Sequence, residues 1–582
     1  MIVALGLVVA ACGGGGPSAS ASGTGAAPTD VASGEPFESS GTFEPMVYPA
    51  EPQDCSFEGD DTHGAYTGEF SQIRAIDEST VEFELCFPDV SFLQKIAFSS
   101  FNIHDTASLE NDMENHRILA RPNGTGPFMI TEWSRGDHIT MTRNPNYWGT
   151  APSYDELIFR WSVDSAQRFV ELQAGTVDGI DNPGPDDFAA IEGDSNLTLF
   201  EREGLNTFYV GFNNNPKIEG YDNSTNPFAN EDVRRAVAMG IDRQQIVDNF
   251  LPDGSEVASH FTPCAIAFAC VGDEWYEFDP EAAQALLADA GFPDGFSTTI
   301  HLRDVVRSYL PIPTQVATEI QTQLRENLNI EAAIDVQESG TFIDNSDGGL
   351  LDGIHLLGWG ADYPDNTNFL DYHFGGGASD QMGDKFDDIV EALQVGGTSP
   401  EDADHEAAYI EANNAIREHV PMVPISHAGS ATVFLADVTE AHASPLSNEQ
   451  FAVMTPGDRD QLVWMQNAEP IGLYCADESD GESLRACEQI NESLYAYEVG
   501  ATAAEPALAT ECTTNEEGTL WTCSLREGVT FHNGAPFDAN DVVLSYAVQW
   551  DLEHPLHIGR DGSFTYYSAL FGGFLNAPAP EE

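Results

Sequence analysis

The segment LWTCSLREGVTFHNGAPFDANDVVLSY, residues 520–546, constrains the fold most, because it carries regular structure close to the end of the sequence. Its pattern predicts a strand, a turn, a second strand, another turn and a helix. No strand-like segment follows this helix, and an isolated strand pair is only marginally stable in water. The segment by itself therefore leaves open what it pairs with.

The length and the charge limit the class of protein. A chain of 582 residues is too long for one hydrophobic core, so we expect two or three lobes. The formal net charge is −74, and the only lysines are Lys95, Lys217 and Lys385. This balance argues against nucleic acid as a partner, because phosphate binding needs a basic face. So much negative charge would repel itself at low salt, but the repulsion is screened within roughly 3 Å at about 1 M salt. We therefore expect a salty habitat, and an ordinary acidic secreted protein is the alternative.

The first residues, MIVALGLVVAAC, form an apolar run that is too short to span a bilayer but suits a signal peptide. The run ends at Cys12 in a Val-Ala-Ala-Cys sequence that resembles a bacterial lipobox, in which the cysteine is lipidated. A Gly/Ser/Ala/Pro-rich stretch follows and is expected to be a flexible tether. No Lys or Arg precedes the run, so either translation starts further upstream or the signal is atypical.

The other eight cysteines are even in number and belong to a chain that has the features of an exported protein. A metal site is the alternative, but no C-x-x-C or Cys/His cluster has zinc-like spacing. Four disulfides between sequence neighbours are the simplest framework, although the sequence allows others. The expected pairs are Cys55 with Cys86, Cys264 with Cys270, Cys475 with Cys487, and Cys512 with Cys523.

Helices and short strands alternate along the rest of the chain, which is typical of α/β lobes. Apolar alternation after a turn at Asp77-Glu78 predicts a half-exposed strand. Residues 123–149 predict two strands around an Arg-Gly-Asp turn, and residues 230–248 predict one amphipathic helix with Asn230 as its N-cap. Gly291 is expected to end a further helix.

Several blocks together resemble the family 5 extracellular solute-binding proteins of bacterial ABC importers, which take oligopeptides, dipeptides, nickel complexes and some sugars. The order of the blocks differs from the family, because its opening blocks stand here at 460–582 and its later ones at 55–460. The sequence therefore looks like a circular permutant, and a misassembled or fused gene is the alternative. The resemblance implies that the helix at 540–550 lies next to the strand at 81–87. The matching blocks are LREGVTFHNGAPFDANDVVLSY, GTGPFMITEWSRGDHITMTRNPNYW, NEDVRRAVAMGIDRQQIV, FDPEAAQALLADAGFPDG, GWGADYPDNTNFL and HVPMVPISH.

The resemblance implies an α/β, two-lobed type II periplasmic-binding-protein fold with an extra subdomain on lobe I. Its expected parts are a lipoprotein signal peptide at 1–12, the tether at 13–52, the second part of the small subdomain at 53–122, lobe I at 123–255, lobe II at 256–430, a return to lobe I at 431–490 and the first part of the small subdomain at 491–582.

The resemblance also implies where a peptide binds. In peptide-binding members the aspartate of a GWxADY-like loop holds the ligand amine, and Asp362 occupies that place here. A turn or capping role is the alternative for Asp362. Trp359 and Tyr363 are candidates for the pocket lining or for the core, and Asn366 is a weaker candidate.

In dipeptide-binding members an arginine that precedes an EIQTQL-like helix segment takes the ligand carboxylate. Counting back in the same way from the EIQTQL segment of this chain leads to Arg307. Arg303 is a competitor, and an ordinary surface arginine is the other reading. Charge-assisted hydrogen bonds to both ends would hold a peptide while accepting many side chains.

We therefore expect an extracytoplasmic binding protein that captures di- or oligopeptides between its lobes and delivers them to ABC permease subunits. It would be a monomer without cofactor or metal, anchored through Cys12 to the outer face of the cytoplasmic membrane, in a periplasm or at a cell surface. A binder of a sugar, an opine or a metal chelate, a surface sensor, and a secreted hydrolase are the alternatives. The hydrolase is disfavoured because the sequence holds no G-x-S-x-G, H-E-x-x-H or Walker motif.

Overall fold

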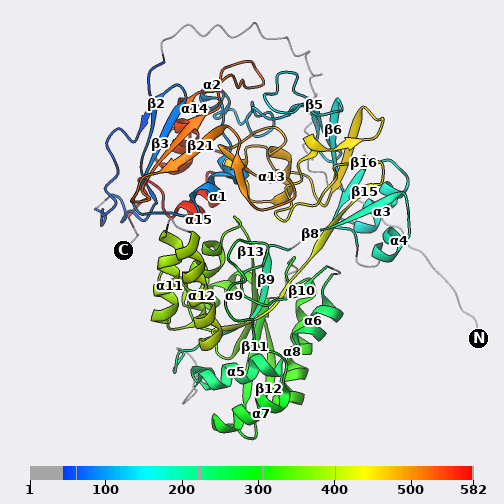
Figure 1. Ribbon diagram of the computed structural model, residues 1–582, viewed down its shortest axis with the longest axis vertical. Coiled ribbons are helices and arrows are strands. Elements are labelled where there is room, and N and C mark those ends of the chain that lie inside the picture. The colour runs from blue at the N-terminus through cyan, green and yellow to red at the C-terminus, as the bar shows by residue number, and fades with distance from the viewer. Residues whose placement is uncertain are drawn as a thin grey trace, which may run out of the picture. The chain divides into compact units, whose positions relative to one another are not determined.

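The computed structural model describes most of the chain (Figure 1). The expected signal peptide, its Cys12 and the tether up to residue 42 lie outside the described residues. The tether was expected to continue to residue 52, but the strand Val47–Tyr48 pairs with Phe70–Asp77, so this part of the chain belongs to a folded sheet. Within the described part of the chain, no helix combines the length and the apolar character needed to cross a bilayer. The described residues are 43–60, 62–184, 187–202, 204–218, 226–252, 254–303, 307–399 and 402–579.

A five-stranded sheet joins the two ends of the described chain, and we call it and its helices the small subdomain. Strand β22 (Leu520–Leu525) pairs antiparallel with β3 (Thr80–Leu85), with Trp521 opposite Phe83. Helix α14 (Ala539–Trp550) packs on the same sheet, and the Ala539 backbone N–H donates to the Glu78 carbonyl. The proximity of the helix at 540–550 to the strand at 81–87, which the family resemblance implied, is therefore confirmed, and Figure 1 shows the blue and orange strands of this sheet side by side. The other elements are β1 (Val47–Tyr48), β2 (Phe70–Asp77), β21 (Ala509–Thr514), α1 (Phe92–Ile96), α2 (Thr106–Asp112) and α15 (Thr565–Phe571).

A seven-stranded mixed sheet forms what we call lobe I. Its strand order is β4-β5-β6-β18-β7-β15-β8, and β18 (Gln461–Gln466) runs parallel to both β6 and β7. The predicted strand pair around the Arg-Gly-Asp turn is confirmed as β4 and β5. The remaining elements are β4 (Phe128–Ser134), β5 (His138–Arg143), β6 (Glu156–Trp161), β7 (Gly179–Asp181), β8 (Leu197–Arg202), β15 (Ser430–Leu435), α3 (Ser165–Gln173), α4 (Phe188–Glu192) and α13 (Gly481–Cys487). Two short ribbons, β16 (Val438–Thr439) with β17 (Thr455–Pro456) and β19 (Tyr495–Tyr497) with β20 (Ala504–Pro506), complete the strands outside lobe II.

A six-stranded sheet with its own hydrophobic core forms what we call lobe II, coloured green in Figure 1. Its strand order is β10-β14-β9-β13-β11-β12. The strands are β9 (Asn206–Phe212), β10 (Glu256–Val257), β11 (Ser297–Arg303), β12 (Glu331–Gln337), β13 (Ile354–Gly360) and β14 (Met422–His427). The helices are α5 (Glu231–Gly240), α6 (Arg243–Phe250), α7 (Pro280–Asp289), α8 (Pro313–Leu328), α9 (Ser339–Asp347), α10 (Tyr372–Phe374), α11 (Asp387–Thr398) and α12 (Asp402–His419).

Two expectations about this region differ from the structure. Residues 206–255 were expected in lobe I, but β9 pairs with β13 and β14 in the lobe II sheet. Every residue of β9 is buried, so its sequence has no polar alternation that would assign the strand to one sheet and not the other. The single helix expected at 230–248 is two helices, because the chain leaves helical geometry at Ile241 and Asp242 caps a new helix. Asn230 caps the first helix as predicted.

The chain crosses between the two lobes at two neighbouring places. One crossing joins the end of β8 to Asn206, and the other joins His427 to Ser430. The Asn206 side chain donates to the Ala428 carbonyl at 2.8 Å and accepts from the Ala428 N–H at 3.0 Å. His427 Nδ1 lies 2.8 Å from the Asn206 carbonyl. Side-chain and main-chain hydrogen bonds thus fasten one crossing to the other.

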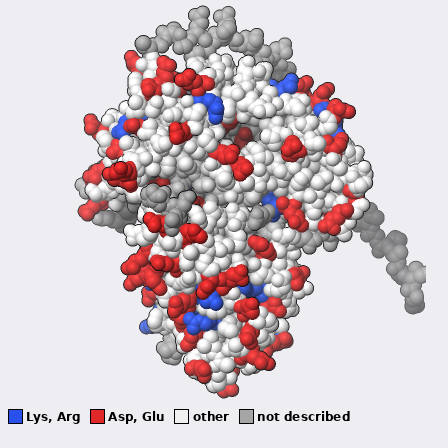
Figure 2. Space-filling model, viewed as in Figure 1, with Lys and Arg blue, Asp and Glu red and all other residues white. Residues whose placement is uncertain are grey.

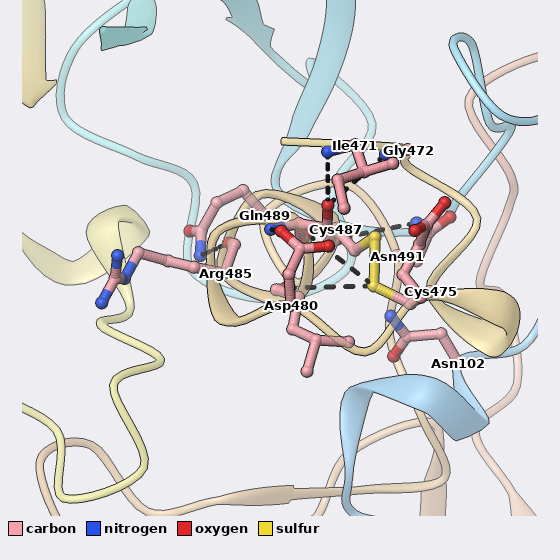
Figure 3. The surroundings of a disulfide bond; sticks show 12 residues. Asn102, Ile471, Gly472, Cys475, Asp480, Arg485, Cys487, Gln489 and Asn491 are labelled. Carbon is pink, nitrogen blue, oxygen red and sulfur yellow. Dashed lines mark hydrogen bonds between the residues drawn. A yellow bond between two sulfur atoms is a disulfide. The ribbon is translucent and has the colours of Figure 1, made fainter. Parts of the chain in front are cut away.

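The structure joins the eight cysteines in the four predicted pairs. The Cys475–Cys487 bond closes the segment that enters α13, and its surroundings are shown in Figure 3. The Ile471 and Gly472 backbone N–H groups donate to the Ser483 hydroxyl, which holds the start of α13 against the preceding loop.

Acidic side chains are spread over the face of the molecule drawn in Figure 2, with few Lys and Arg side chains between them. The distribution follows from the composition, in which 96 Asp and Glu residues stand against 22 Lys and Arg. No single acidic patch on this face indicates a specific partner.

Candidate functional site

A cavity of about 850 Å³ lies between lobe II and the facing wall of lobe I and the small subdomain. Lobe II contributes the end of β13 with the loop after it, and the end of β11 with the segment after it. The facing wall contributes Ser479, Gly481, Glu482 and Tyr566. A cavity of this size between two lobes is typical of a small-molecule or peptide site.

Asp362 stands on the lobe II wall, two residues after β13 ends. The Asn368 side-chain amide donates to its carboxylate at 3.2 Å, and the Asp362 backbone N–H donates to the Asn368 amide oxygen at 3.0 Å. Burial raises the pKa of the Asp362 carboxyl to about 6, against a smaller lowering by Asn368. No described Lys, Arg or His forms an ion pair with this carboxylate. The site thus holds a desolvated carboxylate that a ligand cation would stabilise.

Trp359 gives this wall a flat aromatic surface. Its ring stacks on Tyr372 with 3.9 Å between ring centroids, and its indole N–H donates to Asn368. His373 meets the Trp359 ring edge-on, and burial lowers the pKa of His373 to about 4, so this imidazole is neutral at pH 7. Asn368 therefore ties Trp359 and Asp362 into one hydrogen-bonded unit.

Two arginines line another part of the lobe II wall. The Arg303 guanidinium donates to the Ser339 hydroxyl at 3.1 Å and to the Tyr309 hydroxyl at 3.4 Å. Arg307 also lines the cavity, and its carbonyl accepts from the Leu310 N–H. A guanidinium offers a forked donor that matches a carboxylate. Both candidates named from the sequence thus face the same space as Asp362.

The first turn of α13 supplies an acidic group, Glu482, on the lobe I wall. Glu482 accepts a hydrogen bond from the Asn467 side chain at 3.1 Å, and burial raises its pKa. The Asp480 side chain caps α13 through the Ser483 N–H, and the Cys475–Cys487 bond closes the loop (Figure 3). Sequence reasoning missed Glu482, because its block lies far from the GWGADY loop in the chain and only the fold brings the two together.

Tyr363 and Asn366 do not line this cavity. The Tyr363 side chain is 7% exposed, packs in the core shared by lobe I and the small subdomain, and borders a second cavity of about 490 Å³ beside Lys95. Its ring centroid lies 5.8 Å from the Lys95 ammonium. Asn366 is 2% exposed and donates its amide to the Ala267 carbonyl. Core packing was one of the two alternatives for Tyr363, and the structure shows it, because the chain turns after Asp362 and directs both side chains away from the cavity.

The two lobes, their sheets and the cavity between them have the architecture of a type II periplasmic-binding-protein fold. A family model described as bacterial extracellular solute-binding proteins, family 5, middle, matches residues 37–381 and 503–561. The chain therefore belongs to family 5 of the bacterial extracellular solute-binding proteins.

Named relatives agree with this membership. The chain is 28% identical to di/tripeptide-binding protein 1 of Pseudomonas aeruginosa over 396 residues, which cover 66% of this chain and 71% of that protein. It is 26% identical to heme-binding protein A of Haemophilus influenzae over 368 residues, or 61% of this chain and 64% of that protein. The solved structure of HbpA2 from Haemophilus parasuis superposes with a TM-score of 0.61 at 25% identity, covering 67% of this chain and 76% of that one.

Proposed function

We propose that this protein captures di- or oligopeptides in the interlobe cavity and delivers them to the permease of an ABC importer. The observation that carries the proposal is Asp362, a desolvated carboxylate without a described cationic partner, in a cavity that also presents two guanidinium groups. A peptide has an ammonium at one end and a carboxylate at the other, which complement these groups. The name of the Pseudomonas aeruginosa relative, a di/tripeptide-binding protein, supports the same ligand class.

In this proposal Asp362 accepts the ligand ammonium, and Arg307 or Arg303 donates to the ligand carboxylate. Charge-assisted hydrogen bonds of this kind are about twice as strong as neutral ones, and more so in a site closed from water. Trp359 supplies apolar contact area without selecting one side chain. The protein's role is binding without covalent chemistry, so no residue is assigned a catalytic task.

Capture would be coupled to closure of the lobes about the two crossings. A ligand that contacts both walls stabilises the closed arrangement by its differential affinity for that state. The hydrogen bonds between Asn206 and Ala428 hold the two crossings at a fixed separation, so that both crossings act together as the hinge between the lobes. Closure then presents both lobes to the permease subunits.

We further propose that the protein works as a monomer on the outer face of the cytoplasmic membrane, held through a lipid on Cys12. The lipobox-like sequence and the Gly/Ser-rich stretch after it support this. We also propose that the chain is a circular permutant of its family. The pairing of β22 with β3 supports this, because it rejoins blocks that the family has in the opposite order.

The test is a thermal melt in molar salt with di- to pentapeptides, haemin, sugars and metal chelates as ligands. Peptide at about a hundred times its dissociation constant should add roughly 2.7 kcal/mol to the free energy of unfolding. Asp362→Asn should lose the shift, whereas the control Asp289→Asn, at the exposed end of α7, should keep it. A shift with haemin, a sugar or a chelate and none with any peptide would overturn the peptide assignment.

A further inference from the structure

The described lining of the cavity has one more acidic side chain than basic side chains. Of the residues that the structure describes, three acidic ones line it, Asp347, Asp362 and Glu482, together with Arg303 and Arg307. A peptide with neutral side chains brings one ammonium and one carboxylate, so it leaves this excess of negative charge unchanged. A peptide with one basic side chain would neutralise it.

Glu482 is placed to meet that extra charge. Asp347 is exposed at the end of α9, whereas Glu482 is partly buried on the opposite wall and faces the cavity. Its carboxylate accepts from Asn467 and forms no ion pair with any residue that the structure describes. The other groups on its wall, Ser479, Gly481 and Tyr566, carry no charge at neutral pH.

The Glu482 carboxylate is also held in place, unlike a mobile charge at a rim. It sits in the first turn of α13, whose N-terminus is capped by Asp480 and whose Ser483 hydroxyl accepts from two backbone N–H groups of the preceding loop. The Cys475–Cys487 bond closes the same loop (Figure 3). A fixed carboxylate loses little side-chain entropy on binding a cation.

We propose that Glu482 binds the ammonium or guanidinium of a lysine or arginine side chain in the captured peptide, so that the protein selects cationic peptides. This inference rests on the proposed peptide function. Asp362 on lobe II takes the N-terminal ammonium and Glu482 on lobe I takes the side-chain cation. One ligand then carries a charge-assisted contact to each lobe, and both contacts are complete only when the lobes close on it.

The test compares matched tripeptides by isothermal titration in molar salt: Ala-Gln-Ala, Ala-Glu-Ala, and Ala-based tripeptides with Lys at each of the three positions. The wild-type protein should bind the best Lys peptide about 10-fold or more tightly than Ala-Gln-Ala, and Ala-Glu-Ala most weakly; tenfold is about 1.4 kcal/mol. Glu482→Gln keeps the acceptor for Asn467 and should remove this preference, so that the Lys peptides bind no more tightly than Ala-Gln-Ala. Glu505→Gln, an equal charge change on the exposed β20, should leave the preference intact.

The outcomes separate the two proposals. Binding of no peptide by the wild-type protein would overturn the peptide function and this inference with it. Peptide binding with equal affinity for the Lys and Gln peptides, or equal weakening of both in Glu482→Gln, would overturn the role of Glu482 alone. Restoration of the preference in Glu482→Asp would support a charge effect, and its absence in a folded variant would count against one.

Discussion

Replacing Asp362 with Asn should stabilise the free protein while strongly weakening its binding of peptide. Burial raises the pKa of Asp362 from an ordinary value near 3.8 to about 6, so the folded state holds its proton more tightly than the unfolded chain does. The folded state therefore loses stability as the pH rises from about 4 to 6, and the loss is complete above that range. At 1.36 kcal/mol per pKa unit the cost is about 3 kcal/mol at most, and solvent access reduces it. Asn removes this cost and keeps the side chain's size.

The same pKa predicts how affinity changes with pH. An ammonium ligand binds only the ionised carboxylate, so the apparent dissociation constant should rise about tenfold for each pH unit below 6. Between pH 7.5 and pH 5 the wild-type affinity should fall about 10-fold. Asp362→Asn should show weak binding without this pH dependence.

The assay is a series of melts from pH 5 to pH 8 in molar salt, with and without peptide. In the absence of peptide, the melting temperature of Asp362→Asn should exceed that of the wild type at pH 7.5, and the difference should shrink toward pH 5. Equal melting temperatures at pH 7.5 would refute the desolvation argument. A wild-type affinity that is flat between pH 5 and pH 7.5 would refute the assignment of Asp362 as the ammonium partner.

Other predictions test the supporting structure. Replacing both Cys475 and Cys487 with Ala should lower the free energy of unfolding by about 3 kcal/mol, because the bond restricts the unfolded chain by joining residues 12 apart in the sequence. Denaturant melts measure this change, and an unchanged midpoint would contradict it. Lys95→Met should cost about 3–5 kcal/mol, because it leaves two buried carboxylates without their ammonium, and a loss under about 1 kcal/mol would count against that network. Asn206→Ala should cost about 1–3 kcal/mol and weaken peptide binding, as measured by melts and titration; intact stability would show that its hydrogen bonds to Ala428 are dispensable. Raising NaCl from about 0.1 to 2 M should raise the melting temperature if the acidic surface is adapted to salt, and a fall would oppose that hypothesis.

Local signals in the sequence predicted those elements whose partners are close in the chain. The turn between β2 and β3, the Arg-Gly-Asp hairpin, the Asn230 cap and the four disulfides follow from spacing and turn chemistry. The proximity of α14 to β3 came from the family resemblance and the order of its blocks, and not from a local signal. The turn, the hairpin, the cap and the disulfides could be predicted because each depends on residues that lie close together in the sequence.

Features that depend on long-range packing were harder to predict. The fully buried β9 carries no alternation that would assign it to one sheet, so its lobe could not be predicted. Asp362 and Trp359 face the cavity, but Tyr363 and Asn366 turn into neighbouring cores, because a loop leaving a strand has no fixed periodicity. Glu482 had no signal in its own segment, since only the fold brings it to the cavity that lobe II also lines.

The most direct test of the account is a crystal structure of the protein with a bound Lys-containing tripeptide. The account predicts the N-terminal ammonium about 2.7–2.9 Å from the Asp362 carboxylate, inside the cavity between the lobes. A peptide bound with its ammonium away from Asp362, or bound outside this cavity, would contradict it.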